Sequence, residues 1–266
     1  MISPEERKKK ESEFHDRRER LRTVDPIEYE RMTKNHRFYS VNFASKKFMD
    51  KWLRNHCSED VRALDYCCGA GLNSLFMAQC GAQVVGIDIS SASVESARTL
   101  LRENGLEAKA EFLVRDAEST GFESRSFDVI LCNGVLHHLD LANAFSELER
   151  ILKPGGHVIC VEALAHNPVF QLYRRLTPNM RTAWEVEHIL SRAEIKLAER
   201  YFSSVSPHFF HLLDLLAVPL RTSPVLFKPV LEFLDRFDRV LLSIPGLRWW
   251  AWQCVIILSA PRATTK

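Results

Sequence analysis

The sequence lacks the features that mark several common classes of protein. Its seven cysteines are an odd number and form no Cys-x-x-Cys pair, which argues against a disulfide-stapled fold and a zinc site built on such pairs. Lys and Arg number 36 and Asp and Glu 34, and this balance does not indicate a nucleic-acid binder. The longest apolar run, from Trp249 to Pro261, has 13 residues and is too short to span a bilayer.

What remains is the composition of an ordinary globular protein. The chain has 266 residues, 46% of them hydrophobic and 26% charged, which allows one large domain or two small ones. No apolar stretch follows Met1, and we expect a reduced, cytoplasmic protein. Residues 166–266 carry 13 basic and 8 acidic side chains, a bias that fits either an anionic substrate or surface, or a solvated basic face.

From Val61 onward, short apolar or β-branched runs alternate with amphipathic stretches. The runs cover residues 61–64, 83–89, 110–114, 127–132 and 157–161. The helical stretches between them end at Gly81, at Gly105 and before Pro154-Gly155-Gly156. This alternation predicts a parallel sheet covered on both faces. Farther on, we expect a helix over 191–202, strands over 203–210 and 252–259, and short helices in an apolar insert over 212–247.

Three of the predicted strands end in residues suited to a nucleotide-like ligand. Gly69 and Gly71 follow the first strand and let a ligand approach main-chain N–H groups at a helix N-terminus. Asp88 ends the second strand, where a carboxylate can accept the hydroxyls of a ribose. Asp116-Ala117 follow the third strand, within reach of an adenine amino group. A nicotinamide-dependent dehydrogenase is disfavoured, because Ser74 stands where its third glycine is needed.

Together these residues resemble the class I S-adenosylmethionine-dependent methyltransferases, in particular the small-molecule subgroup of quinone and sterol methyltransferases. The family's opening motif, roughly D-x-G-x-G-x-G, reads Asp65-Tyr66-Cys67-Cys68-Gly69-Ala70-Gly71, with Cys67 in the first glycine position. The strand-four motif matches residues 127–138, and the helix and turn before strand five match 148–156. The resemblance covers residues 55–165 well.

The resemblance implies a Rossmann-like, doubly wound α/β fold with a seven-stranded, mostly parallel sheet whose last strand is antiparallel. We expect an N-terminal helical lid over 1–54, a methyltransferase core over 55–211, the apolar insert over 212–247, and the last strand and tail over 248–266. The implied cofactor is S-adenosylmethionine. The residues implied to bind it are Tyr39, Asp65, Cys67, Gly69, Gly71, Asp88, Ile89, Asp116, Ala117, Asn133, Gly134 and Val135.

The implied activity is methyl transfer to a small, lipophilic or anionic acceptor, with O-methylation favoured. N- or C-methylation and a non-catalytic cofactor-binding scaffold are the alternatives. The candidate bases are His137, His138 and His166, although the His pair of this family also serves as structure. Tyr173, Arg174 and Arg175 are candidates for binding an anionic acceptor, or form a solvated helix face. We expect no metal site and no nucleic-acid partner.

Two further segments have open interpretations. In the insert, one helical face carries apolar residues and the opposite face charged ones: Leu231, Leu234, Phe237, Val240 and Leu241 against Glu232, Asp235, Asp238 and Arg239. Such a face covers a lipophilic acceptor, meets a second copy in a homodimer, touches a membrane surface, or is ordinary core. Near the N-terminus, Phe38, Tyr39 and Phe43 either face the cofactor or pack in the core.

Overall fold

The computed structural model describes residues 3–176, 184 and 188–262. The N-terminal half contains α1 (Pro4–Val24), α2 (Pro26–Met32), η1 (Lys34–Val41), α3 (Phe43–His56), β1 (Arg62–Tyr66), α4 (Leu72–Gln79), β2 (Gln83–Asp88), α5 (Ser91–Glu103), η2 (Glu107–Lys109), β3 (Ala110–Val114) and β4 (Phe127–Asn133). The C-terminal half contains η3 (Leu136–His138), α6 (Leu141–Ile151), β5 (Leu152–Ala163), α7 (Pro168–Leu176), α9 (Arg192–Leu197), η5 (Ala198–Arg200), β6 (Phe202–Phe210), η6 (Asp214–Leu220), α10 (Pro224–Leu241), η7 (Leu247–Trp250) and β7 (Gln253–Pro261).

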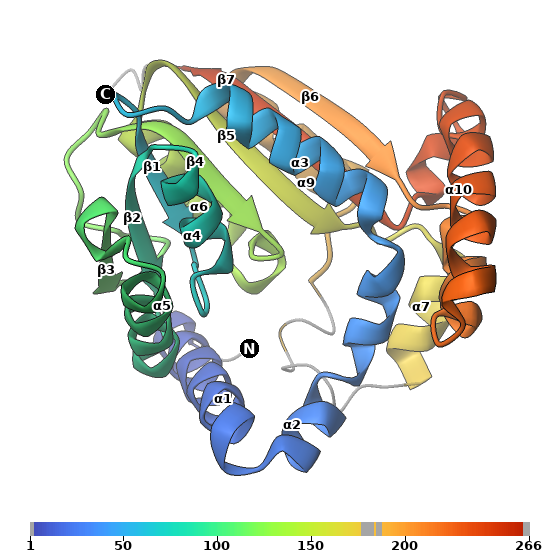
Figure 1. Cartoon of the computed structure of the whole chain (residues 1–266). Coiled ribbons are helices and arrows are strands. Elements are labelled where there is room, and N and C mark those ends of the chain that lie inside the picture. The colour runs from blue at the N-terminus through green and yellow to red at the C-terminus, as the bar shows by residue number, and fades with distance from the viewer. Residues whose placement is uncertain (1–2, 177–183, 185–187, 263–266) are drawn as a thin grey trace.

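The strands form one seven-stranded sheet in the order β3-β2-β1-β4-β5-β7-β6 (Figure 1). The pairs from β3 to β5 are parallel, and β7 lies antiparallel to both β5 and β6. This confirms the predicted α/β fold with an antiparallel last strand. The carboxyl ends of β1, β2, β3 and β4 therefore lie along one edge of the sheet, where open parallel sheets bind ligands.

Two apolar layers cover the faces of this sheet. One contains Met49 and Leu53 of α3, Met77 of α4, and Val94 and Leu101 of α5. The other contains apolar side chains from α6, α9 and η5. Helix α3 is thus a layer of the core, and the expected domain boundary at residue 54 falls inside it.

Three element bounds differ from those expected. Leu152 begins β5 rather than ending the preceding helix, and the register shifts between the pairs Phe127–Leu152 and Val129–His157, so the Pro154-Gly155-Gly156 turn is an irregularity within the strand. The helix expected over 191–202 ends at Leu197 and continues as the short η5. The insert contains one long helix, α10, besides the short η6 and η7.

Helix α10 also corrects the predicted faces of the insert. Leu231 and Leu234 pack inward against a cluster that includes Val41 and Trp252, whereas Phe237 and Val240 are exposed. Asp238, expected on the solvent face, is buried because its carboxylate accepts the N–H groups of Leu212 and Leu213, 2.8 and 2.7 Å away. Of the helices described, none is both long and apolar enough to cross a membrane.

Candidate active site

The carboxyl ends of the central strands surround a cavity of about 240 Å³. Most of the residues proposed to bind the cofactor line it: Cys67, Gly69, Asp88, Ile89, Asp116, Ala117, Asn133, Gly134 and Val135, together with His138. Gly71 lies just behind, as the residue that caps α4, and Asp65 is buried beneath the turn, where Ser74 donates a 2.6 Å hydrogen bond to its carboxylate. The structure thus brings together predicted residues that follow or end four different strands.

The turn after β1 is held in a left-handed conformation. Cys67, Gly69 and Gly71 have φ angles of 61, 51 and 83°. This backbone explains why the family has glycine at the position of Cys67, since any side chain there is strained by about 1–3 kcal/mol. Burial raises the pKa of the Cys67 thiol, and the neighbouring carboxylates of Asp88 and Asp65 raise it further. The thiol therefore stays neutral and is not prepared to act as a nucleophile.

Asp88 joins the tip of β2 to this turn. Its Oδ2 accepts the N–H of Gly69 at 2.9 Å, and its Oδ1 accepts the N–H of Ser90 at 2.8 Å. A carboxylate offers about four acceptor positions, so about two remain for ligand hydroxyls. Asp88 is buried yet lines the cavity. Its geometry fits the ribose-binding role expected for it.

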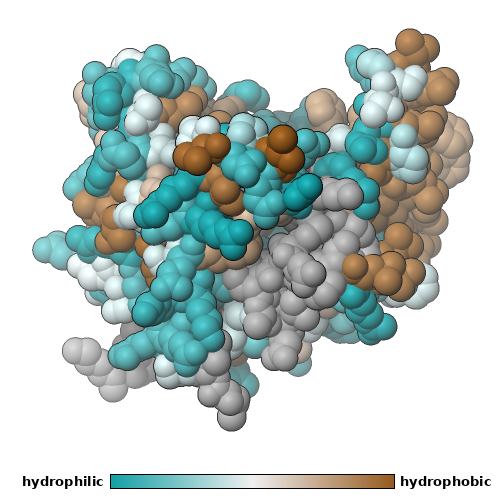
Figure 2. Space-filling model, turned by 90° about the horizontal axis from the view of Figure 1, so that it is seen from below, coloured by the Kyte–Doolittle hydropathy of each residue, from teal (hydrophilic) through white to brown (hydrophobic). Residues whose placement is uncertain are grey.

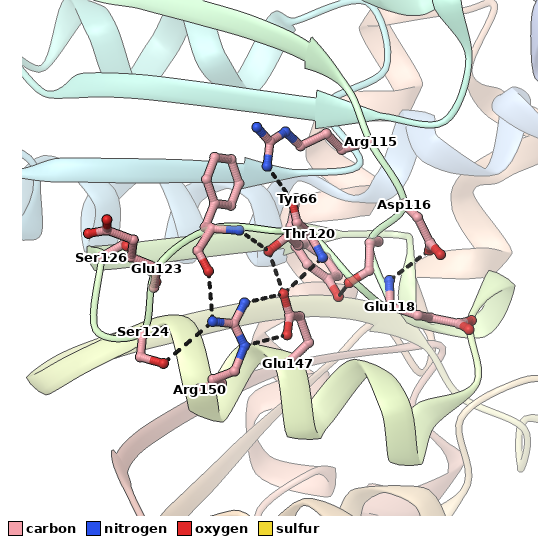
Figure 3. Close-up of polar contacts among 12 residues, drawn as sticks. Tyr66, Arg115, Asp116, Glu118, Thr120, Glu123, Ser124, Ser126, Glu147 and Arg150 are labelled. Atoms are coloured by element: carbon pink, nitrogen blue, oxygen red, sulfur yellow. Dashed lines mark hydrogen bonds and ion pairs between the residues drawn. The ribbon is translucent and has the colours of Figure 1, made fainter.

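The loop after β3 is fixed by a polar network (Figure 3). Tyr66 donates its hydroxyl to the carbonyl of Ala117. Glu147 of α6 accepts from the hydroxyl and the N–H of Thr120, and Arg150 binds the same carboxylate. Burial alone would raise the pKa of Glu147, but its hydrogen bonds to Arg150 and Thr120 outweigh this and lower it. The network holds Asp116-Ala117 at the edge of the cavity.

The loop after β4 is held from β5 by Glu162. This fully buried carboxylate accepts the N–H groups of Val135 and Leu136, both at 2.7 Å, and lies 2.8 Å from Nδ1 of His137. When His137 donates from Nδ1, its Nε2 carries a free lone pair that can accept a proton. Sequence reasoning noted His137 but missed this role of Glu162.

Helix α1 covers the cavity, and its residues were missed by sequence reasoning. Arg7 pairs with Glu118 and donates to the carbonyl of His138 at 2.8 Å, and Lys8 binds Asp116 at 2.7 Å. Burial lowers the pKa of Lys8, but hydrogen bonds to Asp116 and Glu118 raise it overall. Arg7, Lys8, Glu11, His15 and Arg18 line the cavity. In Figure 1, α1 is the blue helix below β2, beside α5.

Three of these side chains are spaced as metal ligands are. Potential ligand atoms of Glu11, His15 and His138 lie within 4.8 Å of one another. However, the Glu11 carboxylate is 3.0 Å from Nδ1 of His138 and 3.6 Å from Nε2 of His15. Burial lowers the pKa of His15, which favours its neutral form. Hydrogen bonding accounts for this arrangement, and we assign no metal to it.

The remaining candidates lie away from the cavity lining. Tyr39 is 46% exposed, its ring lies 5.5 Å from that of Trp252, and its contact with the cofactor stays a prediction. His166 accepts the N–H of Arg192 at 3.3 Å with its Nε2, which leaves that nitrogen no free lone pair. Tyr173, Arg174 and Arg175 lie on α7, where Arg175 is exposed; the side chain of Tyr173 is outside the described part of the structure.

Comparison with known proteins agrees with this geometry. A profile of the family described as "Methyltransferase domain" matches residues 64–160. A sterol 4-C-methyltransferase of Caenorhabditis elegans is 24% identical over 246 residues, covering 80% of this chain and 70% of that protein. A ubiquinone biosynthesis O-methyltransferase of Alkalilimnicola ehrlichii is 38% identical over 119 residues, 43% of this chain and 46% of that protein. Residues 64–160 therefore form a methyltransferase domain, in agreement with the resemblance to the class I S-adenosylmethionine-dependent methyltransferases.

The methyltransferase fold extends beyond the matched domain. The solved structure of geranyl diphosphate C-methyltransferase from Streptomyces coelicolor A3(2) superposes with a TM-score of 0.56 at 18% identity, covering 82% of this chain and 79% of that one. By contrast, the match to the ubiquinone-type methyltransferase spans less than half of that relative. The part matched by the methyltransferase profile, residues 64–160, contains the glycine turn, Asp88 and the loop after β4.

The residues at this edge fit S-adenosylmethionine, the cofactor of the family. Asp88 retains acceptor positions for ribose hydroxyls, whereas the main-chain N–H groups of Cys68, Gly69 and Gly71 are already donated to Ile87, Asp88 and Cys68. The cavity of about 240 Å³ is smaller than the roughly 300–1,000 Å³ typical of ligand sites. Helix α1 contributes five residues to the cavity lining, and its Lys8 occupies one oxygen of Asp116.

Replacing Arg7 and Lys8 by Gln should loosen α1. Helix α1 buries only Arg7 and Glu11, so polar contacts rather than apolar packing hold it in place, and these are sensitive to salt. We expect amide exchange across Pro4–Val24 to speed up roughly tenfold while exchange in the sheet is unchanged. The double change of Lys9 and Lys10 to Gln removes the same charge from exposed positions and is the control. Equal exchange in both variants would show that these pairs do not hold α1.

Proposed function

We propose that this methyltransferase binds S-adenosylmethionine across the tips of β1, β2 and β3 and methylates an oxygen of a small lipophilic acceptor. The observation that carries the proposal is the convergence of the left-handed turn at Gly69, the carboxylate of Asp88 and the loop at Asp116 around one cavity. When bound, the cofactor supplies an activated methyl group on a sulfonium sulfur. The protein has to position the acceptor, exclude water and take up the acceptor's proton.

His137 is the best candidate for taking up that proton. Its Nδ1 faces the buried carboxylate of Glu162 at 2.8 Å, which fixes the orientation of the ring and leaves Nε2 to accept a proton. His138 lines the cavity, but its Nδ1 contacts Glu11 of α1. Neither His137 nor His166 is among the residues that line the cavity, and the contact with Glu162 is what favours His137. A hydroxyl acceptor would lose its proton to Nε2 as its oxygen bonds to the methyl carbon and the bond from that carbon to the sulfonium sulfur breaks, leaving a neutral thioether.

The nature of the acceptor is supported by the surroundings and by relatives. The relatives include a sterol 4-C-methyltransferase, a ubiquinone biosynthesis O-methyltransferase and a demethylmenaquinone methyltransferase, whose names refer to lipophilic small molecules. The exposed apolar residues of α7 and α10 on this chain are consistent with an acceptor of that class.

A transfer assay tests this function. Purified protein is incubated with methyl-labelled S-adenosylmethionine and fractions of a lipid extract, and labelled products are analysed by mass spectrometry. A methyl ether or ester is the expected product. Label on carbon or nitrogen would show that the protein is a C- or N-methyltransferase instead. Cofactor binding without any transfer would identify a non-catalytic scaffold.

Replacing Asp88 by Ala should weaken cofactor binding. The change removes an ionised hydrogen-bond acceptor for the ribose, a loss of about 1.5–3 kcal/mol or roughly ten- to a hundredfold in affinity. Isothermal titration calorimetry with S-adenosylmethionine measures it. Asp60→Ala is the control, since it removes an exposed acid at the opposite end of β1. An unchanged affinity in the Asp88 variant would show that the ribose lies elsewhere.

A further inference from the structure

Part of the apolar surface of α10 is left uncovered by the described part of the chain. Its inward residues, Phe227, Val230, Leu231 and Leu234, pack against a cluster formed by Val41, Phe170, Ala217, Val218 and Trp252. Its outward apolar residues are exposed on one side of the helix and just beyond its end: Val225, Leu226, Phe233, Phe237, Val240 and Ile244. Phe233 and Phe237 are 58% and 49% exposed, although their rings touch each other. Core packing does not account for these residues.

Helix α7 extends this surface. Val169, Leu172 and Leu176 follow one another at helical spacing and are exposed, whereas Phe170 points into the same cluster that holds α10. The two helices lie side by side in Figure 1, and apolar atoms gather on that side of the molecule in Figure 2. We call the nine exposed apolar residues of α7, α10 and its C-terminal end the α7–α10 face. An exposed apolar surface of this kind marks a binding site for an apolar partner.

The charges around the α7–α10 face are mainly positive. Arg221, Lys228, Arg236 and Arg239 are exposed, and Arg175 is exposed on α7. Two of the acids in the insert do not offset them at the surface, since Asp214 and Asp238 are buried. Asp235 and Arg239 form an ion pair and offset each other, which leaves Arg175, Arg221, Lys228 and Arg236 against the exposed Glu232. A groove of about 510 Å³ between α3 and α10 is lined by four basic residues, Lys47, Lys228, Arg236 and Arg239, and by three acidic ones, Asp214, Glu232 and Asp235.

We propose that the α7–α10 face rests on the surface of a bilayer that contains anionic phospholipid. Apolar side chains flanked by exposed Lys and Arg have the chemistry of an interfacial helix, with the apolar side among the acyl chains and the cations at the headgroups. A second copy of the chain fits less well. A twofold dimer through this face would bring the same arginines and lysines of both copies together. The inference goes beyond methyl transfer and does not depend on it.

Vesicle sedimentation tests the proposal on the full chain. The protein should sediment with vesicles of phosphatidylcholine and phosphatidylglycerol, and much less with phosphatidylcholine alone. Replacing both Phe233 and Phe237 by Ser should weaken binding to the mixed vesicles, roughly tenfold for each ring removed. Replacing Lys228 and Arg236 by Gln should reduce the preference for the anionic vesicles while leaving residual binding.

Matched controls separate this outcome from its alternatives. Val24 and Ile27 are 80% and 70% exposed but lie outside the face, so their double change to Ser should leave vesicle binding intact. Thermal unfolding checks that the Phe233/Phe237 variant is folded. Absence of sedimentation with either vesicle overturns the proposal. A dimer in sedimentation velocity that the Phe233/Phe237 variant dissociates would overturn it in favour of self-association.

Discussion

Gly71→Ala should lower the free energy of unfolding by about 2–5 kcal/mol. Gly71 has a φ of 83°, and a Cβ placed there would lie 2.8 Å from Cβ and 2.9 Å from Cα of Ala97 in α5. The backbone strain and the contact with a buried helix add to each other, because neither the turn after β1 nor α5 can move without disturbing the sheet's covering layer. Urea unfolding followed by circular dichroism measures the loss.

Gly69→Ala is the matched control for this prediction. It has a φ of 51°, but nothing lies within 4 Å of the added Cβ, so only the strain of about 1–2 kcal/mol remains. A double-mutant cycle with Ala97→Gly isolates the steric part, since removing the Cβ of Ala97 should recover some of the stability lost in Gly71→Ala. If both variants lose the same free energy of unfolding, the close contact between the added Cβ and Ala97 does not destabilise the protein.

The sheet edge could be predicted from the sequence because its signals are local. Gly69 and Gly71 are required by the left-handed turn, and Asp88 and Asp116 each directly end or follow a strand. Strand order then follows from the general rules of α/β folds, which place the tips of β1, β2 and β3 next to one another. The cofactor-binding roles given to individual residues stay predictions.

The cover over that edge could not be predicted, because its contacts join residues far apart in the sequence. Lys8 and Asp116 are 108 residues apart, and Arg7 and Glu118 are 111. Helix α1 has no apolar stripe that would reveal which side faces the core. Its charges look like those of a solvated helix until their partners are placed in space.

The insert was predicted in part, for a related reason. Helical spacing identified an amphipathic segment, but spacing alone assigns every apolar residue to the core and every charged one to solvent. Asp238 departs from that rule because it accepts N–H groups at the start of η6, a tertiary contact. Phe237 and Val240 depart from it because the core beneath α10 is narrower than the helix's apolar surface.

Asp65 should make the stability of this methyltransferase fall as pH rises. Burial raises the pKa of Asp65 from 3.8 to about 7, against the hydrogen bonds from Ser74 that lower it, and the charge of Asp88 adds to the rise. The folded protein therefore binds a proton between pH 4 and 7 that the unfolded chain has released. The contribution of Asp65 to the free energy of unfolding is fully present below pH 4. It decreases as the pH rises to 7, by at most about 4 kcal/mol.

Asp65→Asn removes the ionisation and should remove this loss. The variant can still accept the hydrogen bond of Ser74, so its stability relative to the natural protein should increase from pH 5 to pH 7 and then level off. Urea unfolding at several pH values measures the difference, with Asp60→Asn as an exposed control. Parallel pH profiles of the Asp65 variant and the natural protein would show that this carboxyl is ionised in the fold.

A protonated Asp65 also predicts that cofactor binding releases a proton, because the positive charge of the cofactor nearby favours the carboxylate. Calorimetry in buffers of different ionisation enthalpy measures that proton. It should be detected in the natural protein and not in the Asp65→Asn variant.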